Sequence, residues 1–150
     1  MNTLFRTLLS IVLLIGAMNA KADLEIFKDY DLGSEILSMS MVKVDANRGD
    51  AYLEGLRETW VKSNQIQKEL GHIKDYQILV SDLPQGGEFN MILIVQFKKT
   101  EDLEPSKRRY EQFMKKWGEK AADESREISK DYHKVRSIVG EYRFRELNMK

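Results

Sequence analysis

The segment from Glu88 to Lys98 constrains the fold most strongly, because its side chains are apolar on both faces of an extended chain. One face carries an unbroken apolar row of Phe89, Met91, Leu93, Val95 and Phe97. The other face holds Asn90, Ile92, Ile94 and Gln96. A strand that is apolar on both sides is typical of the interior of a sheet, where both faces are covered. We therefore predict a central β-strand here, with neighbouring strands on each side of it.

Three further segments alternate between apolar and polar side chains, which is the pattern of a β-strand. They are Ile36–Val44, His72–Asp82 and Ser137–Met149. In each of them we expect one strongly apolar face to meet the core. These core-facing residues are predicted to be Leu37, Met39, Met41, Tyr76, Ile78, Val80, Tyr142 and Phe144.

Two segments repeat apolar residues at helical spacing. The first is Asp50 to Leu70, and Gly71 after it suits the left-handed residue that often follows a helix. The second begins at Pro105 and continues to about residue 130, with Gly118 inside it as a point where the helix bends or loosens. The first helix is predicted to connect the first two strands, and the second to connect the last two.

The resulting order, β-α-β-β-α-β, predicts an α+β fold of the ferredoxin-like type. We expect a four-stranded antiparallel sheet with two helices on one face, formed by residues 36–150 after a leader of residues 23–35. The other face of the sheet would be open, and we expect it to be too apolar for free exposure to water. Its predicted residues are Ser38, Ser40, Val42, Val44, Gln77, Leu79, Asn90, Ile92, Ile94, Gln96, Val139, Glu141, Arg143, Arg145 and Leu147.

Between Ile36 and Met149 the chain resembles the dimeric α/β-barrel superfamily, which includes the antibiotic-monooxygenase-like proteins. The resemblance lies in the element order and the facial pattern, with the short motifs "ETW" at Glu58–Trp60 and "GEYRFRE" at Gly140–Glu146. It implies a homodimer whose open sheet faces meet, and a cavity for a small molecule. Activities in this superfamily range from heme-degrading and cofactor-free oxygenases to proteins without a known reaction.

Residues 1–22 have the features of an export signal. Arg6 supplies a positive charge, Leu8–Ala17 forms a short apolar core, and Ala20-Lys21-Ala22 is a small-residue cleavage site. We expect cleavage before Asp23 and export, most simply to a bacterial periplasm, with membrane contact only during export. An uncleaved membrane anchor is the alternative. The chain has no cysteine, so an exported form would fold without disulfides.

Composition argues against several function classes. Basic and acidic residues balance to a net charge of zero, which favours neither nucleic acid nor anionic membrane as a partner. RNA-binding domains of similar topology need aromatic residues on the open face of the third strand, where this chain has Asn90, Ile92, Ile94 and Gln96. The only histidines, His72 and His133, show no metal-site spacing, so we expect no metal and no cofactor. The serines lack a nucleophile motif.

The residues left for function are polar side chains of the predicted open face and one histidine. Arg143 and Arg145 suit an anionic ligand because a guanidinium binds carboxylate or phosphate through two hydrogen bonds. Alternatively, with Glu141, they protect an edge strand or pair across a dimer interface. The full candidate ligand-binding set is Arg143, Arg145, Glu141, Gln77, Asn90, Gln96 and His72.

These observations favour an exported homodimer that binds a small molecule or a partner in the cell envelope. A cofactor-free or heme-linked enzyme of the monooxygenase-like type is the alternative, with Tyr76 added to the candidate residues. A purely structural envelope protein, in contact through the charged 119–130 helix surface, is a third possibility.

Overall fold

The computed structural model describes residues 23–83 and 86–150. The predicted signal peptide, residues 1–22, lies outside the described residues, as do residues 84–85. Across the described parts of the chain, none of the helices has both the length and the apolar character needed to cross a bilayer.

The protein is an α+β structure with two antiparallel sheets. The larger sheet has the strand order β3-β4-β2-β5, in which every neighbouring pair is antiparallel. Its strands are β2 (Ile36–Val44), β3 (Asp75–Val80), β4 (Met91–Phe97) and β5 (Arg136–Phe144). β4 lies inside the sheet, as its two apolar faces predicted, and β5 is an edge strand.

The first predicted helix is one continuous rod made of three segments. It consists of α1 (Gly49–Leu56), the π-helical turn η1 (Arg57–Val61) and α2 (Lys62–Glu69). The second predicted helix is divided in two, α3 (Lys107–Trp117) and α4 (Glu119–Lys130). Short 3₁₀ turns precede α3 (η2, Thr100–Leu103) and follow α4 (η3, Tyr132–Lys134).

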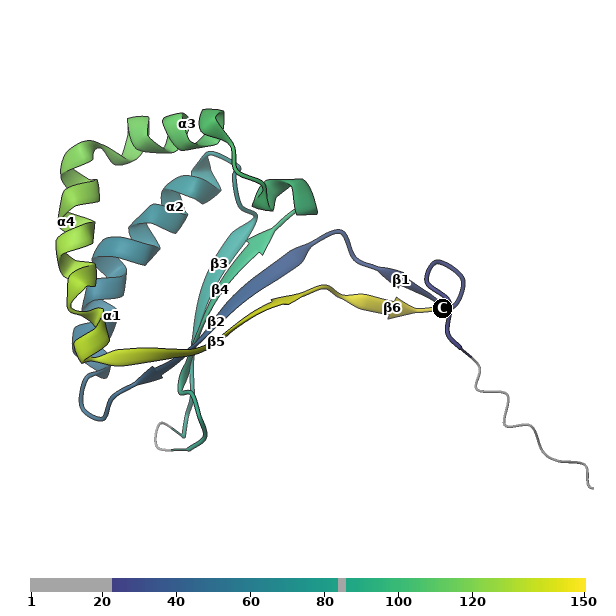
Figure 1. Ribbon diagram of the computed structural model, residues 1–150, viewed down its shortest axis with the longest axis horizontal. Coiled ribbons are helices and arrows are strands. Elements are labelled where there is room, and N and C mark those ends of the chain that lie inside the picture. The colour runs from purple at the N-terminus through teal and green to yellow at the C-terminus, as the bar shows by residue number, and fades with distance from the viewer. Residues whose placement is uncertain (1–22, 84–85) are drawn as a thin grey trace, which may run out of the picture.

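Two glycines end helices through the left-handed backbone conformation that side chains disfavour. Gly71, with φ of +70°, follows α2, as the sequence predicted. Gly118, with φ of +80°, separates α3 from α4, and Figure 1 shows that the two helices run in different directions. Ser106, rather than Pro105, caps the start of α3, because its Oγ accepts a hydrogen bond from the Arg109 backbone N–H (3.3 Å).

The core lies between the larger sheet and the helices, which gather on one side of it (Figure 1). Its buried members are Val42, Val44, Tyr52, Leu56, Met91 and Leu93. Trp60, Ile78, Tyr132 and Val135 pack against this cluster. The predicted core side of β3 and β4 is therefore confirmed, and the Trp60 ring packs edge-on against Tyr76 at 5.6 Å.

The predicted faces of β2 are the reverse of those in the structure. Val42 lies in the core and pairs with Met91, and residues that pair across antiparallel strands share a face. Side chains alternate along a strand, so Ser38 and Ser40 lie on the helix side with Val42 and Val44. Leu37, Met39 and Met41, predicted to be in the core, lie on the open face instead.

A β-bulge in β5 sets the faces of the C-terminal strand. Met41 pairs with Gly140, but the next residue, Val42, pairs with Ile138, which leaves Val139 as an extra residue. A one-residue shift moves the following side chains to the opposite face. Tyr142 and Phe144 are therefore on the open face, where their rings stack at 6.1 Å.

This bulge also moves the two charged residues on either side of Tyr142. Glu141 pairs with Ser40 and Arg143 pairs with Ser38, so both lie on the helix side of the sheet. Their predicted place on the open face is wrong. Gly140 provides space within the bulged strand, because a Cβ there would lie 2.6 Å from the Tyr142 ring.

The predicted final strand is two strands, and the predicted leader takes part in the fold. β6 (Leu147–Met149) pairs with β1 (Tyr30–Leu32) in a two-stranded ribbon that projects beyond the larger sheet (Figure 1). Arg145 lies at the junction. Its guanidinium donates to the Gly33 and Ser34 carbonyl oxygens, both at 3.2 Å, and to the Thr100 hydroxyl at 2.6 Å.

Two leucines of α1 give a matched test of this core. Leu56 is 1% exposed, whereas Leu53 on the same helix is 37% exposed. We expect Leu56→Ala to lower the free energy of unfolding by about 2–5 kcal/mol, because it leaves a cavity in the core. Leu53→Ala should cost about 1 kcal/mol or less, since that side chain is already partly in water. Urea denaturation followed by circular dichroism measures both, and equal losses would contradict the packing described above.

Candidate functional site

A cleft of about 360 Å³ opens between the sheet, the long first helix and α4. The sheet contributes its floor, and the two helices contribute its walls. Its lining residues are Ser40, Val42, Tyr52, Leu56, Thr59, Trp60, Ser63, Leu93, Ser125, Ser129, Tyr132, Arg136 and Ile138. This combination of hydroxyl, aromatic and aliphatic groups around a single guanidinium makes the cleft the best candidate for a ligand site.

Two tyrosines and one arginine form the polar end of the cleft. The rings of Tyr52 and Tyr132 meet edge to face, with centroids 5.2 Å apart. The Arg136 Cζ atom lies 5.9 Å from the centre of the Tyr52 ring and 5.6 Å from that of Tyr132. Both distances are within the range of a cation–π contact, so the two rings hold the guanidinium in place.

The π-helical turn supplies the third hydroxyl of this cluster. Thr59, in the middle of the turn, is only 4% exposed. Its Oγ1 donates to the Gly55 carbonyl oxygen at 2.9 Å and lies 2.6 Å from the Tyr132 hydroxyl. π-helical turns occur frequently at functional sites because they displace side chains from their regular helical positions. Here the turn links the first helix to Tyr132, which lies in η3 after α4.

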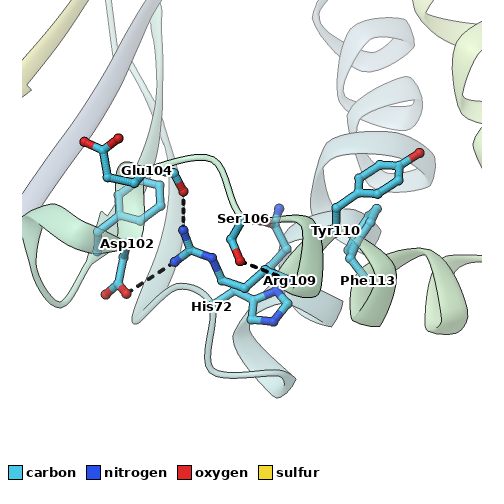
Figure 2. Close-up of a pocket in the computed structure, with 9 residues that line it drawn as sticks. His72, Asp102, Glu104, Ser106, Arg109, Tyr110 and Phe113 are labelled. Atoms are coloured by element: carbon cyan, nitrogen blue, oxygen red, sulfur yellow. Dashed lines mark hydrogen bonds and ion pairs between the residues drawn. The ribbon is translucent and has the colours of Figure 1, made fainter.

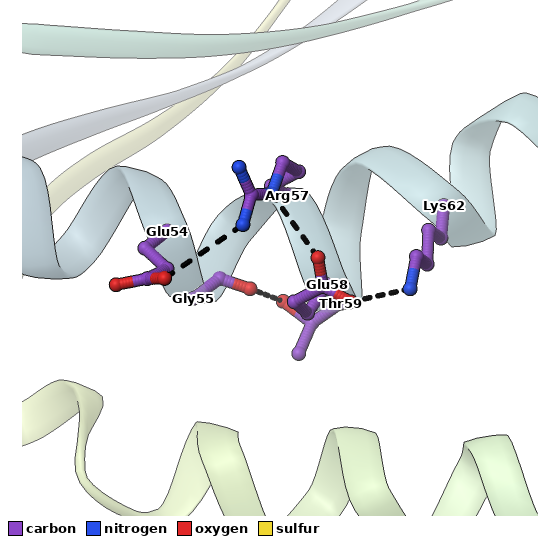
Figure 3. A network of polar contacts seen from close by, with 6 residues as sticks. All are labelled: Glu54, Gly55, Arg57, Glu58, Thr59 and Lys62. Carbon is purple, nitrogen blue, oxygen red and sulfur yellow. Dashed lines mark hydrogen bonds and ion pairs between the residues drawn. The ribbon is translucent and has the colours of Figure 1, made fainter.

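The opposite side of the same turn carries surface ion pairs (Figure 3). Arg57 lies between Glu54 at 3.7 Å and Glu58 at 3.1 Å, and Lys62 pairs with Glu58. A hydrogen bond from Lys62 is the main reason that the pKa of Glu58 is below its usual value. These exposed pairs contribute little stability individually. Thr59, by contrast, lies on the side of the helix that faces α4 (Figure 3).

Gly55 allows the close approach of Tyr132 to the first helix. A Cβ at this position would lie 2.9 Å from the Tyr132 ring and 3.1 Å from its hydroxyl oxygen. Any larger residue would displace the ring from Thr59. The glycine is therefore needed for packing, although glycine inside a helix lowers intrinsic helix stability.

The electrostatics of the cleft favour neutral phenols and a positive guanidinium. Burial raises the pKa of Tyr52 and of Tyr132, and this effect outweighs the opposing influence of the nearby Arg136 charge. No aspartate, glutamate or lysine lines the cleft in the described part of the chain. The Arg136 Nε atom is buried and has no hydrogen-bond partner.

The hydroxyls of the helix walls are already bonded to their own helices. Ser63 donates to the Trp60 carbonyl oxygen at 3.0 Å, and Ser129 donates to the Ser125 carbonyl oxygen at 2.7 Å. Each serine therefore keeps only acceptor lone pairs for another group. The buried Nε atom of Arg136, by contrast, is a donor without a hydrogen-bond partner.

A second, smaller pocket of about 250 Å³ lies between α2, η2 and α3 (Figure 2). Its guanidinium, that of Arg109, is already occupied. Arg109 pairs with the Asp102 carboxylate at 3.4 Å and donates to the carbonyl oxygens of Glu101 and Glu104. These contacts hold the turn before α3 in place, so the guanidinium of this pocket already has a carboxylate partner.

The predicted ligand-binding residues do not form one site. His72 is in the second pocket, where its Nε2 lies 3.2 Å from Gln112 Oε1. Asn90 links the ends of β4 and β2 through two hydrogen bonds of 2.8 Å with the Val44 backbone. Arg145 bonds to backbone at the junction with the ribbon. All three have structural contacts that account for their polar groups.

The remaining candidates are divided between the two faces of the sheet. Gln77 pairs with Ile94 on the open face, and Gln96 on the same face donates to Glu35 Oε2 at 2.6 Å. Glu141 and Arg143 lie on the helix side of the edge strand β5 and do not line the cleft. A hydrogen bond from Lys74 is the main reason that the pKa of Glu35, the partner of Gln96, is below its usual value.

Sequence reasoning missed the cluster at the end of the cleft. In the sequence, Tyr52 flanks the apolar stripe of the first predicted helix and Tyr132 is at the end of the stripe of the second, and neither position indicates a ligand site. Arg136 begins β5 and has no sequence feature that distinguishes it from other surface arginines. These residues meet only because α4 packs beside the first helix.

The open face of the sheet is a second candidate surface. Its apolar members are Leu37, Met39, Met41, Leu79, Ile92, Ile94, Tyr142 and Phe144. Tyr142 is 50% exposed and Phe144 is 48% exposed, although both are large and apolar. A contiguous apolar face of this kind is typical of an interaction surface.

Metal ligands are not clustered in the described residues, which contain no group of three or more His, Cys, Asp or Glu side chains able to hold a metal ion. His133 contacts the Lys130 carbonyl oxygen at 2.7 Å, and neither histidine lines the cleft. A heme in the cleft would therefore lack a histidine ligand from the described chain. Comparisons with protein families, curated proteins and solved structures find no match.

The buried tyrosines predict a stability change at alkaline pH. Their pKa values are raised in the folded state, so the folded protein keeps phenolic protons that the unfolded chain loses above about pH 10. The free energy of unfolding should be at its full value below that pH and fall as the pH rises through the folded-state pKa. Tyr132→Phe should make this fall shallower. Denaturation curves at successive pH values measure it, and an identical slope in the variant would contradict the assignment.

Proposed function

We propose that the protein is an exported, homodimeric binding protein for a small molecule, with its open sheet faces in contact and its cleft as the binding site. The observation that carries the proposal is the continuous apolar open face, which the β5 bulge extends by placing Tyr142 and Phe144 on it. The helix-side cleft, with Arg136 at its polar end, complements this surface, because it remains accessible when the opposite face of the sheet is covered.

A second copy of the chain is the partner that best suits the open face. Its ten central members, eight apolar residues with Gln77 and Gln96, include no formal charge, and the charged residues of this face, Lys43 and Asp75, lie near strand ends. In a two-fold symmetric pair the same patch meets itself, so a charged patch would oppose like charges. An uncharged apolar patch avoids that repulsion, and its burial stabilises the pair by roughly 25 cal/mol per Å² of apolar surface.

The strand order β3-β4-β2-β5 supports the finer proposal of a ferredoxin-like unit of the dimeric α/β-barrel type. In chain order within this sheet, the first strand lies beside the third and the last, and the second is at the far edge. Two helical connections cover a single face. The ribbon of β1 and β6 is an addition to that plan.

A pair of tyrosines gives a direct test of the dimer. Tyr142 lies on the open face, whereas Tyr110 lies on α3 and is 64% exposed. We expect Tyr142→Glu to convert the dimer into a monomer, because it buries a charge in the apolar contact. Tyr110→Glu should leave the dimer intact. Light scattering coupled to size exclusion reports the mass, and a monomeric parent protein would remove the proposal.

Export is the part of the proposal that rests on residues 1–22 alone. When the full chain is expressed in a bacterium with a periplasm, we expect the periplasmic fraction to contain a chain that begins at Asp23. Intact-mass spectrometry of that fraction identifies the new N-terminus. Ala20→Tyr should block processing, because the cleavage site requires small residues. Recovery of the unprocessed parent chain from the cytoplasm alone would contradict export.

A further inference from the structure

We propose that the ligand of the cleft is a small planar carboxylate with an aromatic or aliphatic body, held by Arg136. This inference rests on the proposed binding function and adds the chemical class of the ligand. A guanidinium presents its N–H groups in a plane that matches the two oxygens of a carboxylate. The carboxylate would meet Arg136 at the polar end, and the body would extend along the apolar wall.

The state of Arg136 is the first argument. Its guanidinium has a side-chain hydrogen bond with Tyr52, but its buried Nε atom has no hydrogen-bond partner. An unsatisfied buried donor costs free energy, which a ligand oxygen would recover. Arg109, the guanidinium of the second pocket, differs because it already has the Asp102 carboxylate and backbone carbonyl oxygens as partners.

The charge of the lining residues is the second argument. Arg136 is the only formally charged residue among those that line the cleft, and the phenols of Tyr52 and Tyr132 remain neutral at physiological pH. An anion entering the cleft therefore meets one positive group and no carboxylate. A cationic ligand would face the guanidinium without any acidic partner.

The shape and the walls of the cleft set the size and body of the ligand. A volume of about 360 Å³ is near the lower end for small-molecule sites, which suits a benzoate-sized molecule and is small for a nucleotide or a heme. Leu56, Leu93 and Trp60 provide apolar contacts for the body. The serine hydroxyls on the helix walls offer acceptors to a hydroxyl group on the ligand.

The experiment uses the fluorescence of Trp60, which lines the cleft. The chain has two tryptophans, and the other, Trp117, stacks on Phe113 in α3, so Trp117→Phe leaves Trp60 as the only reporter. Sodium benzoate is the probe, and benzamide is its neutral analogue of similar shape. We expect a saturable change with benzoate and binding roughly tenfold or more weaker for benzamide.

Variants of β5 locate the interaction. Arg136→Gln should remove the preference for benzoate over benzamide, and Arg136→Lys should restore only part of it because lysine lacks the planar fork. Arg143→Gln, on the same strand and outside the cleft, should leave both affinities unchanged. If Arg136→Gln does not fold, the comparison of the two probes in the Trp117→Phe protein still decides the question.

The outcomes separate this inference from the function on which it rests. Benzoate binding that is lost in Arg136→Gln but kept in Arg143→Gln supports the carboxylate site. Benzamide binding as tightly as benzoate overturns the carboxylate preference while leaving a small-molecule cleft. Binding of neither probe by a dimeric protein overturns the inference and leaves the dimer standing.

Discussion

The pairing of β2 with its two neighbours is the constraint on which the rest of the structure depends. Val42 and Val44 pack beneath Tyr52 and Leu56, so the alternation of the strand places Leu37, Met39 and Met41 on the other face. The bulge at Val139 then adds Tyr142 and Phe144 to that same face. A single sheet thus has a helix-covered side with a polar cleft and an open side that is almost entirely apolar.

In the proposed function, the two sides of the sheet have separate roles. A largely apolar face suits a second copy of the chain, and a hydroxyl-lined cleft whose guanidinium has a buried Nε atom without a partner suits a small anion. The cleft and the open face share two strands, β2 and β5. Ser40 of β2, for example, lines the cleft, and its neighbour Met41 lies on the open face.

The sequence predicts the elements of this fold better than it predicts their faces. β2 has the bounds that alternation indicated, β4 is interior, and Gly71 and Gly118 end helices. Alternation identifies the two faces of a strand but not which face meets the helices. In β2 the face with the methionines is as apolar as the face with the valines, so the pattern does not choose between them. The bulge reversed the prediction for β5, and Gly140 within the strand was a signal for it that the alternation pattern alone does not use.

The candidate site was harder to predict because it is made by tertiary contacts. Tyr52, Thr59, Tyr132 and Arg136 come from separate segments, and they meet only after α4 packs on the π-helical turn. The polar residues predicted for the open face were conspicuous in the sequence, but Asn90, Gln96 and Arg145 bond to backbone or to neighbouring side chains. A residue whose polar groups already have partners is a weak indicator of a ligand site.

The central claim, that a second copy covers the open face, is tested most directly by isotope-filtered NOE spectroscopy. The sample would mix labelled and unlabelled copies of the processed chain, with the methyl groups of Met39 and Met41 as reporters. The account predicts intermolecular contacts from these methyls to apolar side chains of the other copy, together with intramolecular contacts to Tyr142 and Ile94. Methyl contacts to Trp60 and Leu56, with no intermolecular signal, would contradict it.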